Sequence, residues 1–243
     1  MRVTLTPSFI LHHRPYKETS MLLELFSRDY GRISLVAKGV RRNKKRSPAL
    51  YQLYRDLNVS WSGRASLATL TEIEANGPGF DLQGEAMMAA FYLNELLMRL
   101  LHQHESHSQL YDAYMMALTR LGHGESQLFA LRYFEKQLLD ALGYGLVLDH
   151  DLVSGDPIEA ECDYYYSIDQ GPSSSKPMTT EFVTIAGSTL LALDREELDE
   201  HSKLDGIKQL MRLTLRGYLG DKPLASRELY QAYMLQKRGP VTS

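Results

Sequence analysis

Cysteine is almost absent from this chain, which has one, Cys162, among 243 residues. A single thiol excludes a disulfide within the chain and a zinc site built from several thiolates. We therefore expect neither a zinc ion nor any other cofactor. Acidic residues surround Cys162 and would raise the pKa of its thiol, which argues against a cysteine nucleophile.

Long hydrophobic runs are missing as well. The longest uninterrupted apolar run covers residues 86–93, far fewer than the ~20 residues that a membrane-spanning helix needs. The first residues contain no continuous apolar stretch of the kind found in secretion signals. We therefore expect a cytoplasmic protein with no membrane partner.

Two signatures of enzyme active sites are missing or incomplete. No G-x-x-x-x-G-K-[ST] loop occurs, so ATP hydrolysis is not expected. His102, His104 and His107 lie close in sequence, but they lack the i, i+4 spacing with which a helix presents two metal ligands. We therefore expect no metal site at these histidines and no catalytic residues.

Positive charge is concentrated at the start of the chain, although the whole chain has a net charge of −3. Residues 1–80 contain 13 Lys and Arg against 6 Asp and Glu, a net of +7. Residues 81–243 contain 14 against 24, a net of −10. Such asymmetry is typical of a protein in which one part contacts a nucleic acid.

The cations gather between two predicted strands, in a segment that we call the cationic loop. We predict that this loop contacts phosphates. The alternative is a solvated loop without a partner. Its members are Lys38, Arg41, Arg42, Lys44, Lys45 and Arg46.

The first third of the chain has the pattern of a small β-barrel. Turn residues separate five predicted strands at 9–14, 20–27, 32–38, 57–61 and 67–73. Five strands with one long basic connection are typical of an OB-fold barrel, which we assign to residues 1–79. Alternation predicts two buried faces, made by Ile33, Leu35 and Ala37 and by Leu57, Val59 and Trp61.

After residue 79 the apolar period lengthens from two to about 3.6 residues. Helices are predicted at 85–104, 108–121, 127–142 and 203–219. We therefore expect residues 80–243 to form a mainly α-helical domain with a small irregular or β part near the C-terminus, so that the chain is α+β. Within this domain, residues 147–180 are expected to form an acidic loop region with a flexible link at 173–175.

The acidic loop region leaves one enzymatic interpretation open. A metal-dependent nuclease acting on single-stranded DNA would hold Mg²⁺ with carboxylates. The simpler interpretation is a solvated linker, and a third class is a protein-interaction scaffold without DNA affinity. The carboxylates concerned are Asp149, Asp151, Asp156, Glu159, Glu161 and Asp163.

A second group of cations lies on the last predicted helix. Lys208, Arg212 and Arg216 recur every four residues and share one helical face. We call these three residues the cationic stripe, which continues toward Lys222 and Arg227. It is a candidate second DNA-binding surface.

Aromatic residues in the barrel are candidates for stacking on unpaired bases. Tyr30, Tyr51 and Tyr54 are the preferred ones, because base stacking on aromatic rings is tolerant of sequence. Trp61 is assigned to the barrel core instead. No recognition helix is indicated, which favours single-stranded, sequence-tolerant binding.

Several ordered motifs extend over nearly the whole chain. They are FILHHRPYKETS at 9–20, GRISLVAKG at 31–39, YLNELL at 92–97, LRYFE at 131–135, LGYG at 142–145, and YLGDKPL at 218–224 followed by Ser226-Arg227. In these motifs the chain resembles the RecO family of recombination mediators. Asp221 and Leu53 depart from a usual glycine and proline, and only Cys162 remains of a four-cysteine zinc module found in many members.

The resemblance implies an N-terminal OB domain and a helical domain that bind single- and double-stranded DNA. It implies annealing of complementary strands without nucleotide hydrolysis. It also implies help in loading RecA at gaps coated by single-strand binding protein, in DNA repair and homologous recombination. The implied partners are DNA, RecR and the acidic C-terminal tail of single-strand binding protein, and the implied location is the nucleoid.

An acidic peptide that ends in a hydrophobic residue needs an apolar groove beside a cation. Arg132, with Leu131 next to it in a predicted apolar helix, is the first candidate for this site, and Arg120 is the second. The alternative is that Arg132 pairs with Glu135 or Asp140 of its own domain.

Overall fold

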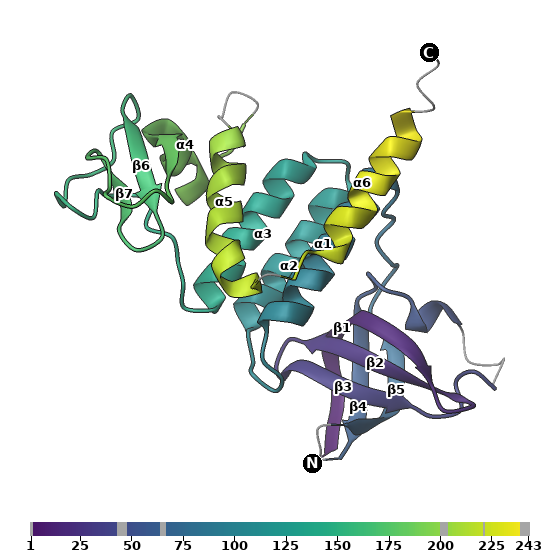
Figure 1. Ribbon diagram of the computed structural model, residues 1–243. Helices are drawn as coiled ribbons and strands as arrows, with labels where there is room; N and C mark the ends of the chain where they lie inside the picture. Colours follow the sequence, from purple (N-terminus) through teal and green to yellow (C-terminus); the bar gives the residue numbers. More distant parts are fainter. Residues whose placement is uncertain (1, 43–47, 64–66, 200–203, 221, 239–243) are drawn as a thin grey trace. The chain divides into compact units, whose positions relative to one another are not determined.

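The computed structural model describes residues 2–42, 48–63, 67–199, 204–220 and 222–238 (Figure 1). The chain forms two compact units. Unit 1 comprises residues 1–124 and 224–243, and unit 2 comprises residues 125–223. The expected domain boundary after residue 79 falls inside unit 1, and the division into 1–79 and 80–243 stays a prediction. None of the helices in the described ranges is long and apolar enough to cross a membrane.

A closed five-stranded barrel forms the N-terminal part of unit 1 (Figure 1). The order β1-β2-β3-β5-β4 is closed by hydrogen bonds between β4 and β1, and only β3 and β5 pair in parallel. The predicted barrel and α+β class are confirmed. The strands are β1 (Arg2–Tyr16), β2 (Ser20–Ser27), β3 (Gly31–Ala37), β4 (Leu57–Ser62) and β5 (Ala68–Ala75), and a short 3-10 helix, η1 (Pro48–Tyr51), precedes β4.

The barrel interior is the apolar core that alternation predicts. Leu35, Leu57 and Val59 are completely buried, and Trp61 is 3% exposed. All of them belong to one cluster with residues of β1 and β2. Both predicted faces are therefore confirmed, and Trp61 is a core residue.

Strand β1 begins seven residues earlier than predicted, at Arg2. Its first half pairs with β4 and its second half with β2, so that one long strand closes the barrel. A register shift between Val3 and Thr6 places Leu5 at a φ of 37° and leaves it 40% exposed. Because this irregularity breaks the alternation, the sequence pattern does not predict the first half of the strand.

Helices α1 (Gly84–Leu100) and α2 (Ser108–Gly122) pack on the outside of the barrel. Phe9 of β1 lies 5.2 Å from Tyr111 and 5.1 Å from Tyr114, measured between ring centroids. Phe26 of β2 lies 5.5 Å from Tyr111. Buried aromatic pairs at such distances contribute beyond their buried area, so this cluster attaches the helices to the barrel.

A buried asparagine fixes the position of α1 on β1. The side-chain Nδ2 of Asn94 donates to the backbone oxygen of Leu11 at 2.8 Å, and its Oδ1 accepts a hydrogen bond from the Tyr114 hydroxyl at 2.5 Å. Asn94 is 5% exposed and Tyr114 is completely buried. Burial raises the pKa of the Tyr114 phenol well above its ordinary value, so this hydroxyl stays a donor. One amide thus links a strand and two helices.

The segment after α1 lies against the β2–β3 turn. The predicted helix 85–104 ends at Leu100, because the following residues bond to the barrel instead: His104 N donates to Arg32 O at 3.0 Å. Gly31 has a φ of +65°, and a Cβ there would lie 1.7 Å from Glu105 O. Glycine is required at this turn by both its backbone conformation and the close approach.

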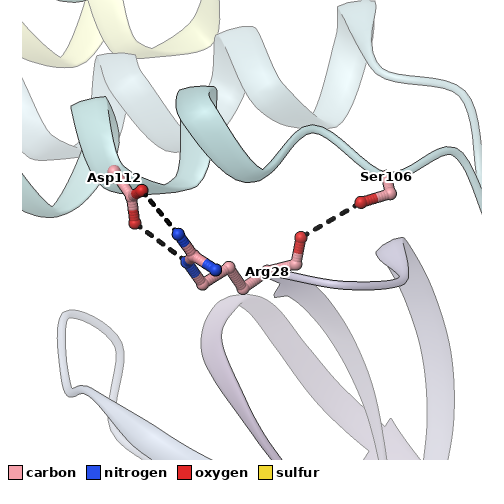
Figure 2. Close-up of polar contacts among 3 residues, drawn as sticks. All are labelled: Arg28, Ser106 and Asp112. Carbon is pink, nitrogen blue, oxygen red and sulfur yellow. Dashed lines mark hydrogen bonds and ion pairs between the residues drawn. The ribbon is translucent and has the colours of Figure 1, made fainter.

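An ion pair at the surface adds to this attachment. Figure 2 shows the Arg28 guanidinium donating to both carboxylate oxygens of Asp112 in α2, at 3.0 and 2.8 Å, and Ser106 donating to the Arg28 backbone oxygen at 3.2 Å. The Arg28 and Asp112 side chains are 41% and 48% exposed. Exposed ion pairs are weak, so Asn94 and the aromatic cluster provide most of the attachment.

The C-terminal helix α6 (Ala225–Arg238) returns to unit 1 and packs beside α1 (Figure 1). The Glu95 carboxylate of α1 accepts hydrogen bonds from the backbone nitrogens of Ala225 and Ser226 at 2.9 and 2.8 Å and from the Ser226 hydroxyl at 2.6 Å. Burial opposes the ionisation of Glu95, but these bonds outweigh it and lower its pKa. A carboxylate is favourable at this helix N-terminus, and α6 was not predicted.

Unit 2 combines helices with a three-stranded sheet of order β7-β6-β8. Helix α5 packs against α3, α4 and β8. The small β part is thus confirmed, and α5 is the predicted helix 203–219 apart from residue 203, which lies outside the described residues. The elements are α3 (Gln127–Ala141), β6 (Asp163–Ser167), β7 (Gly171–Ser173), β8 (Val183–Ala186), α4 (Gly187–Asp194) and α5 (Leu204–Leu219).

A buried carboxylate organises part of the predicted acidic loop region. Asp151 is 2% exposed and accepts hydrogen bonds from Val153 N at 2.8 Å, Ser154 N at 3.2 Å, and Ser174 N and Oγ at 2.7 and 3.0 Å. The expectation of a solvated linker is therefore wrong at Asp151, and the flexible link at 173–175 stays a prediction, although Ser173 belongs to a strand and Ser174 is hydrogen-bonded to Asp151. Burial opposes ionisation, but these hydrogen bonds outweigh it, so the pKa of Asp151 is lowered.

Replacing Asn94 by Ala should lower the free energy of unfolding by about 2–4 kcal/mol, because the Leu11 carbonyl would lose its amide donor and the buried Tyr114 hydroxyl would lose this acceptor. Urea unfolding measures this change. Asn76→Ala is the matched control, since Asn76 is exposed and its side chain makes one exposed hydrogen bond, to Asp56 at 2.8 Å, so that its removal should cost at most about 1 kcal/mol. Equal stabilities for wild type and Asn94→Ala would contradict this role.

Replacing Asp151 by Asn should destabilise the protein by about 2 kcal/mol at pH 7, because an amide nitrogen would face backbone donors. A lowered folded-state pKa stabilises the protein above the unfolded value of about 3.9, and this stabilisation is lost as the pH falls through the folded value. The difference between wild type and variant should therefore shrink below about pH 4. Unfolding curves across pH test this, with exposed Asp169→Asn as control.

Candidate nucleic-acid interface

The described part of the cationic loop lies on the barrel surface after β3. Lys38, Arg41 and Arg42 are exposed. Lys44, Lys45 and Arg46 lie outside the described residues. Among the residues that the structure describes, no ion pair involves Lys38, Arg41 or Arg42. Their charges are therefore not neutralised by a described carboxylate.

The start of the loop is held in place by the β1–β2 turn. The Arg41 backbone nitrogen donates to Thr19 O at 3.0 Å, and its guanidinium Nη1 lies 3.4 Å from Glu18 O. Gly39 has a φ of +70°, a conformation that glycine adopts without strain. The direction of the chain at Arg41 and Arg42 is thus set by backbone contacts to a neighbouring turn.

The end of the β1–β2 hairpin carries functional candidates that sequence reasoning missed. His12, His13, Arg14 and Lys17 are exposed there and Tyr16 is partly exposed. Burial, and then the neighbouring His12, lower the pKa of His13. All of these residues belong to the FILHHRPYKETS motif. The sequence feature that could have identified them as candidates is the group of two histidines, an arginine and a lysine around one tyrosine.

Two of the three predicted stacking residues of the barrel are buried. Tyr51 and Tyr54 are each 4% exposed, so the prediction that they meet DNA bases is wrong. The Tyr30 ring packs edge-on against Trp61, with 5.2 Å between ring centroids. Tyr30 is partly exposed, so its stacking on a base stays a prediction. Tyr51 and Tyr54 were misplaced because their spacing in the sequence does not show that the segment before β4 turns them inward.

The cationic stripe is exposed along α5 in unit 2. Lys208, Arg212 and Arg216 are all exposed, as their spacing predicts. Lys208 also lies 3.1 Å from Asp205, one turn earlier in the helix. Both side chains of this pair are largely solvated, so the pair is weak. Lys222 is exposed too, and Arg227 lies on α6 in unit 1.

Arg132 has the intramolecular partner that the sequence left as an alternative. Its Nη1 lies 2.9 Å from the Glu135 carboxylate, one turn further along α3. The Arg132 side chain is 12% exposed and that of Glu135 is 1% exposed. Leu131 is partly exposed in unit 2, and Arg120 is partly exposed on α2 in unit 1. A ligand carboxylate at Arg132 would have to share the guanidinium with Glu135.

One carboxylate of unit 2, Asp151, and the Cys162 thiol form hydrogen bonds within the protein. Among the described residues, no group of three or more His, Cys, Asp or Glu side chains is placed to hold a metal ion. Asp151 is hydrogen-bonded to backbone and serine donors. The hydrogen bond to Glu159, followed by burial and further carboxylates, raises the pKa of the exposed Cys162 thiol, as predicted. The expectation of no zinc stays a prediction for elemental analysis.

Two family models match this chain. The model described as the N-terminal part of recombination protein O matches residues 1–78, and that of its C-terminal part matches residues 82–228. A DNA repair protein RecO of Nitrosococcus oceani is 44% identical over 242 residues, which are 100% of this chain and 98% of the relative. Relatives of the same name from Coxiella burnetii and Methylococcus capsulatus are each 44% identical, over 94% and 95% of this chain and 98% and 94% of their own lengths.

Proposed function

Because the chain belongs to the RecO family of DNA repair proteins, which are non-catalytic recombination mediators, we propose that it binds DNA through its barrel and anneals complementary strands. We propose further that it helps to load RecA at gaps coated by single-strand binding protein. RecR is a proposed partner on the family relationship alone, and no residue is assigned to that contact.

One observation carries the DNA-binding proposal. Lys38, Arg41 and Arg42 project from the barrel without an ion-pair partner among the described residues. Cations that neutralise phosphates release counterions, which gives affinity without regard to sequence. A protein that handles gaps of any sequence needs that kind of binding.

A nuclease that acts on single-stranded DNA is the rival function. It would use carboxylates of the acidic loop region to hold Mg²⁺. The hydrogen bonding of Asp151 argues against this, because both of its oxygens already accept bonds from the protein. Incubating labelled DNA with the protein and Mg²⁺ separates the two functions: annealing with intact strands supports the mediator, and cleavage supports the nuclease.

We propose the cationic stripe of α5 as a contact for a second strand. Annealing requires two strands held close enough to pair, and the stripe offers exposed cations at one-turn intervals. A surface separate from the cationic loop would let one strand stay bound to the loop while another is captured.

We also propose that Arg132 and Leu131 bind the acidic tail of single-strand binding protein, with Arg120 as the second candidate. A guanidinium can hold two carboxylates through different nitrogens. The terminal hydrophobic residue of the tail would lie against Leu131, which is only partly buried. At this site the tail carboxylate would compete with Glu135 for the guanidinium of Arg132.

Replacing Arg41, Arg42, Lys44 and Lys45 together by Ala should weaken binding to all single-stranded DNA sequences alike. If each cation meets a phosphate, the log–log salt slope should fall by up to ~2.8, at ~0.7 per charge. Fluorescence anisotropy over a salt series measures this. Lys176→Ala with Arg195→Ala removes two exposed charges of unit 2 and should leave the slope as it is. An unchanged slope in the loop variant would mean that the loop is only solvated.

Reversing Lys208, Arg212 and Arg216 to Glu should impair annealing more than binding of one oligonucleotide, because only annealing uses the second strand. The cationic-loop variant is the comparison and should impair both to a similar extent. Annealing is followed by energy transfer between dyes on the two strands, and binding by anisotropy. Equal losses in the two assays for the stripe variant would argue against a second-strand surface.

Removing both charges of the buried pair, with Arg132→Met and Glu135→Gln together, should weaken binding of the isolated tail peptide tenfold or more and leave DNA affinity unchanged. The single Arg132→Ala variant is less informative, since removing one partner of a buried ion pair costs about 3–5 kcal/mol of stability. Glu135→Gln alone is the control, because it frees Arg132 and should retain peptide binding. If calorimetry gave the same peptide dissociation constant for wild type and for the double variant, Arg132 would not be the binding site, and Arg120 would be tested next.

A further inference from the structure

The end of the β1–β2 hairpin, residues 12–19, extends the strands beyond the barrel core. Tyr16 is the last residue of β1 and is not a member of the core cluster. Arg14 and Lys17 are exposed, and among the described residues no ion pair involves either one. The partly exposed Tyr16 ring therefore lies next to two exposed cations in the chain and outside the apolar core cluster of the barrel.

The strand register places Arg14 and Tyr16 on the same face. Arg14 pairs with Leu22 and Tyr16 with Ser20, and residues two apart in a strand point to the same side. Their Cα atoms are about 6.6 Å apart at the usual rise of a strand. The ring therefore has a cation beside it along the strand.

Lys17, in the β1–β2 turn, places a second cation beside the Tyr16 ring. It has a φ of +52°, and its Nζ lies 5.5 Å from the centroid of the Tyr16 ring. A cation at that distance is attracted to the ring face and restricts its motion. The ring is thus held by a neighbour that also carries a charge able to meet a phosphate.

The hairpin is continuous with the cationic loop. The Arg41 backbone nitrogen donates to Thr19 O at 3.0 Å, and Arg41 Nη1 approaches Glu18 O at 3.4 Å. A nucleic-acid strand on the loop would therefore have the hairpin end as its next contact.

We propose that Tyr16 is a stacking site for an unpaired base of single-stranded DNA, with Arg14 and Lys17 on the adjacent phosphates. This inference rests on the proposed DNA binding and adds to it a preference for unpaired bases, which phosphate contacts alone cannot give. A duplex keeps its bases stacked inside, so the ring can meet only a strand whose bases are free. Stacking on an aromatic residue changes affinity by about fivefold to a hundredfold per base.

The test compares two strands of equal length and charge, an oligothymidine and the same strand with abasic sites. Wild type should prefer the oligothymidine. Tyr16→Ala should lose about tenfold or more in affinity for the oligothymidine but little for the abasic strand, and the preference should disappear. Tyr16→Phe keeps the ring and should retain the preference.

The salt dependence separates stacking from charge. Tyr16→Ala should leave the salt slope unchanged, whereas Arg14→Ala with Lys17→Ala should lower it by up to ~1.4, at ~0.7 per charge. Tyr144→Ala is the matched control, since Tyr144 is an exposed tyrosine of unit 2, and it should bind both strands like wild type.

The outcomes distinguish this inference from the proposed function. If wild type binds both strands and Tyr16→Ala binds them with the same affinities, the stacking site is overturned while DNA binding stands. If wild type binds neither strand, both the stacking site and the proposed function are overturned. A loss in Tyr16→Ala that is equal for the two strands would also contradict stacking, because it would not depend on the bases.

Discussion

A buried side-chain amide, that of Asn94, determines how unit 1 is assembled. Its two hydrogen bonds join β1 to α1 and α1 to α2, and neither partner has access to water. Buried polar groups without partners are costly, and the observed placement of α1 on the barrel keeps the hydrogen bonds of all three groups. The next residue, Glu95, then binds the start of α6, and the C-terminal helix depends on the same placement.

This assembly agrees with the proposal that the barrel binds the first DNA strand and that unit 2 makes the other contacts. At one set of turns the barrel presents a partly exposed tyrosine and cations that have no ion-pair partner among the described residues, and its interior is filled with apolar side chains. Such a surface can hold a strand by its phosphates and bases and has no need to move atoms between substrates. The cations of α5 and the Arg132–Glu135 pair belong to unit 2. They are the proposed contacts for the second DNA strand and for the tail of single-strand binding protein.

The sequence predicted those parts whose signal is local. Alternation predicted the buried faces around Leu35 and Val59, and helical spacing predicted the exposed stripe of α5. It did not predict the end of α1 or the helix α6, because these depend on contacts with Gly31 and Glu95 that are far away in the chain. It also misplaced Tyr51 and Tyr54 outside the core, because the sequence pattern does not show that the segment before β4 turns them inward. It placed Asp151 in solvent, because burial of a carboxylate depends on hydrogen-bond partners that no periodicity shows.

Annealing by the wild-type protein tests the central claim most directly. Two complementary labelled oligonucleotides are mixed with the protein in the presence of a chelator and without nucleotide, and their pairing is followed by energy transfer. The account predicts pairing well above the spontaneous rate, with both strands intact and with the acceleration declining as salt rises. Pairing at the spontaneous rate, although the protein binds each single strand, would contradict it.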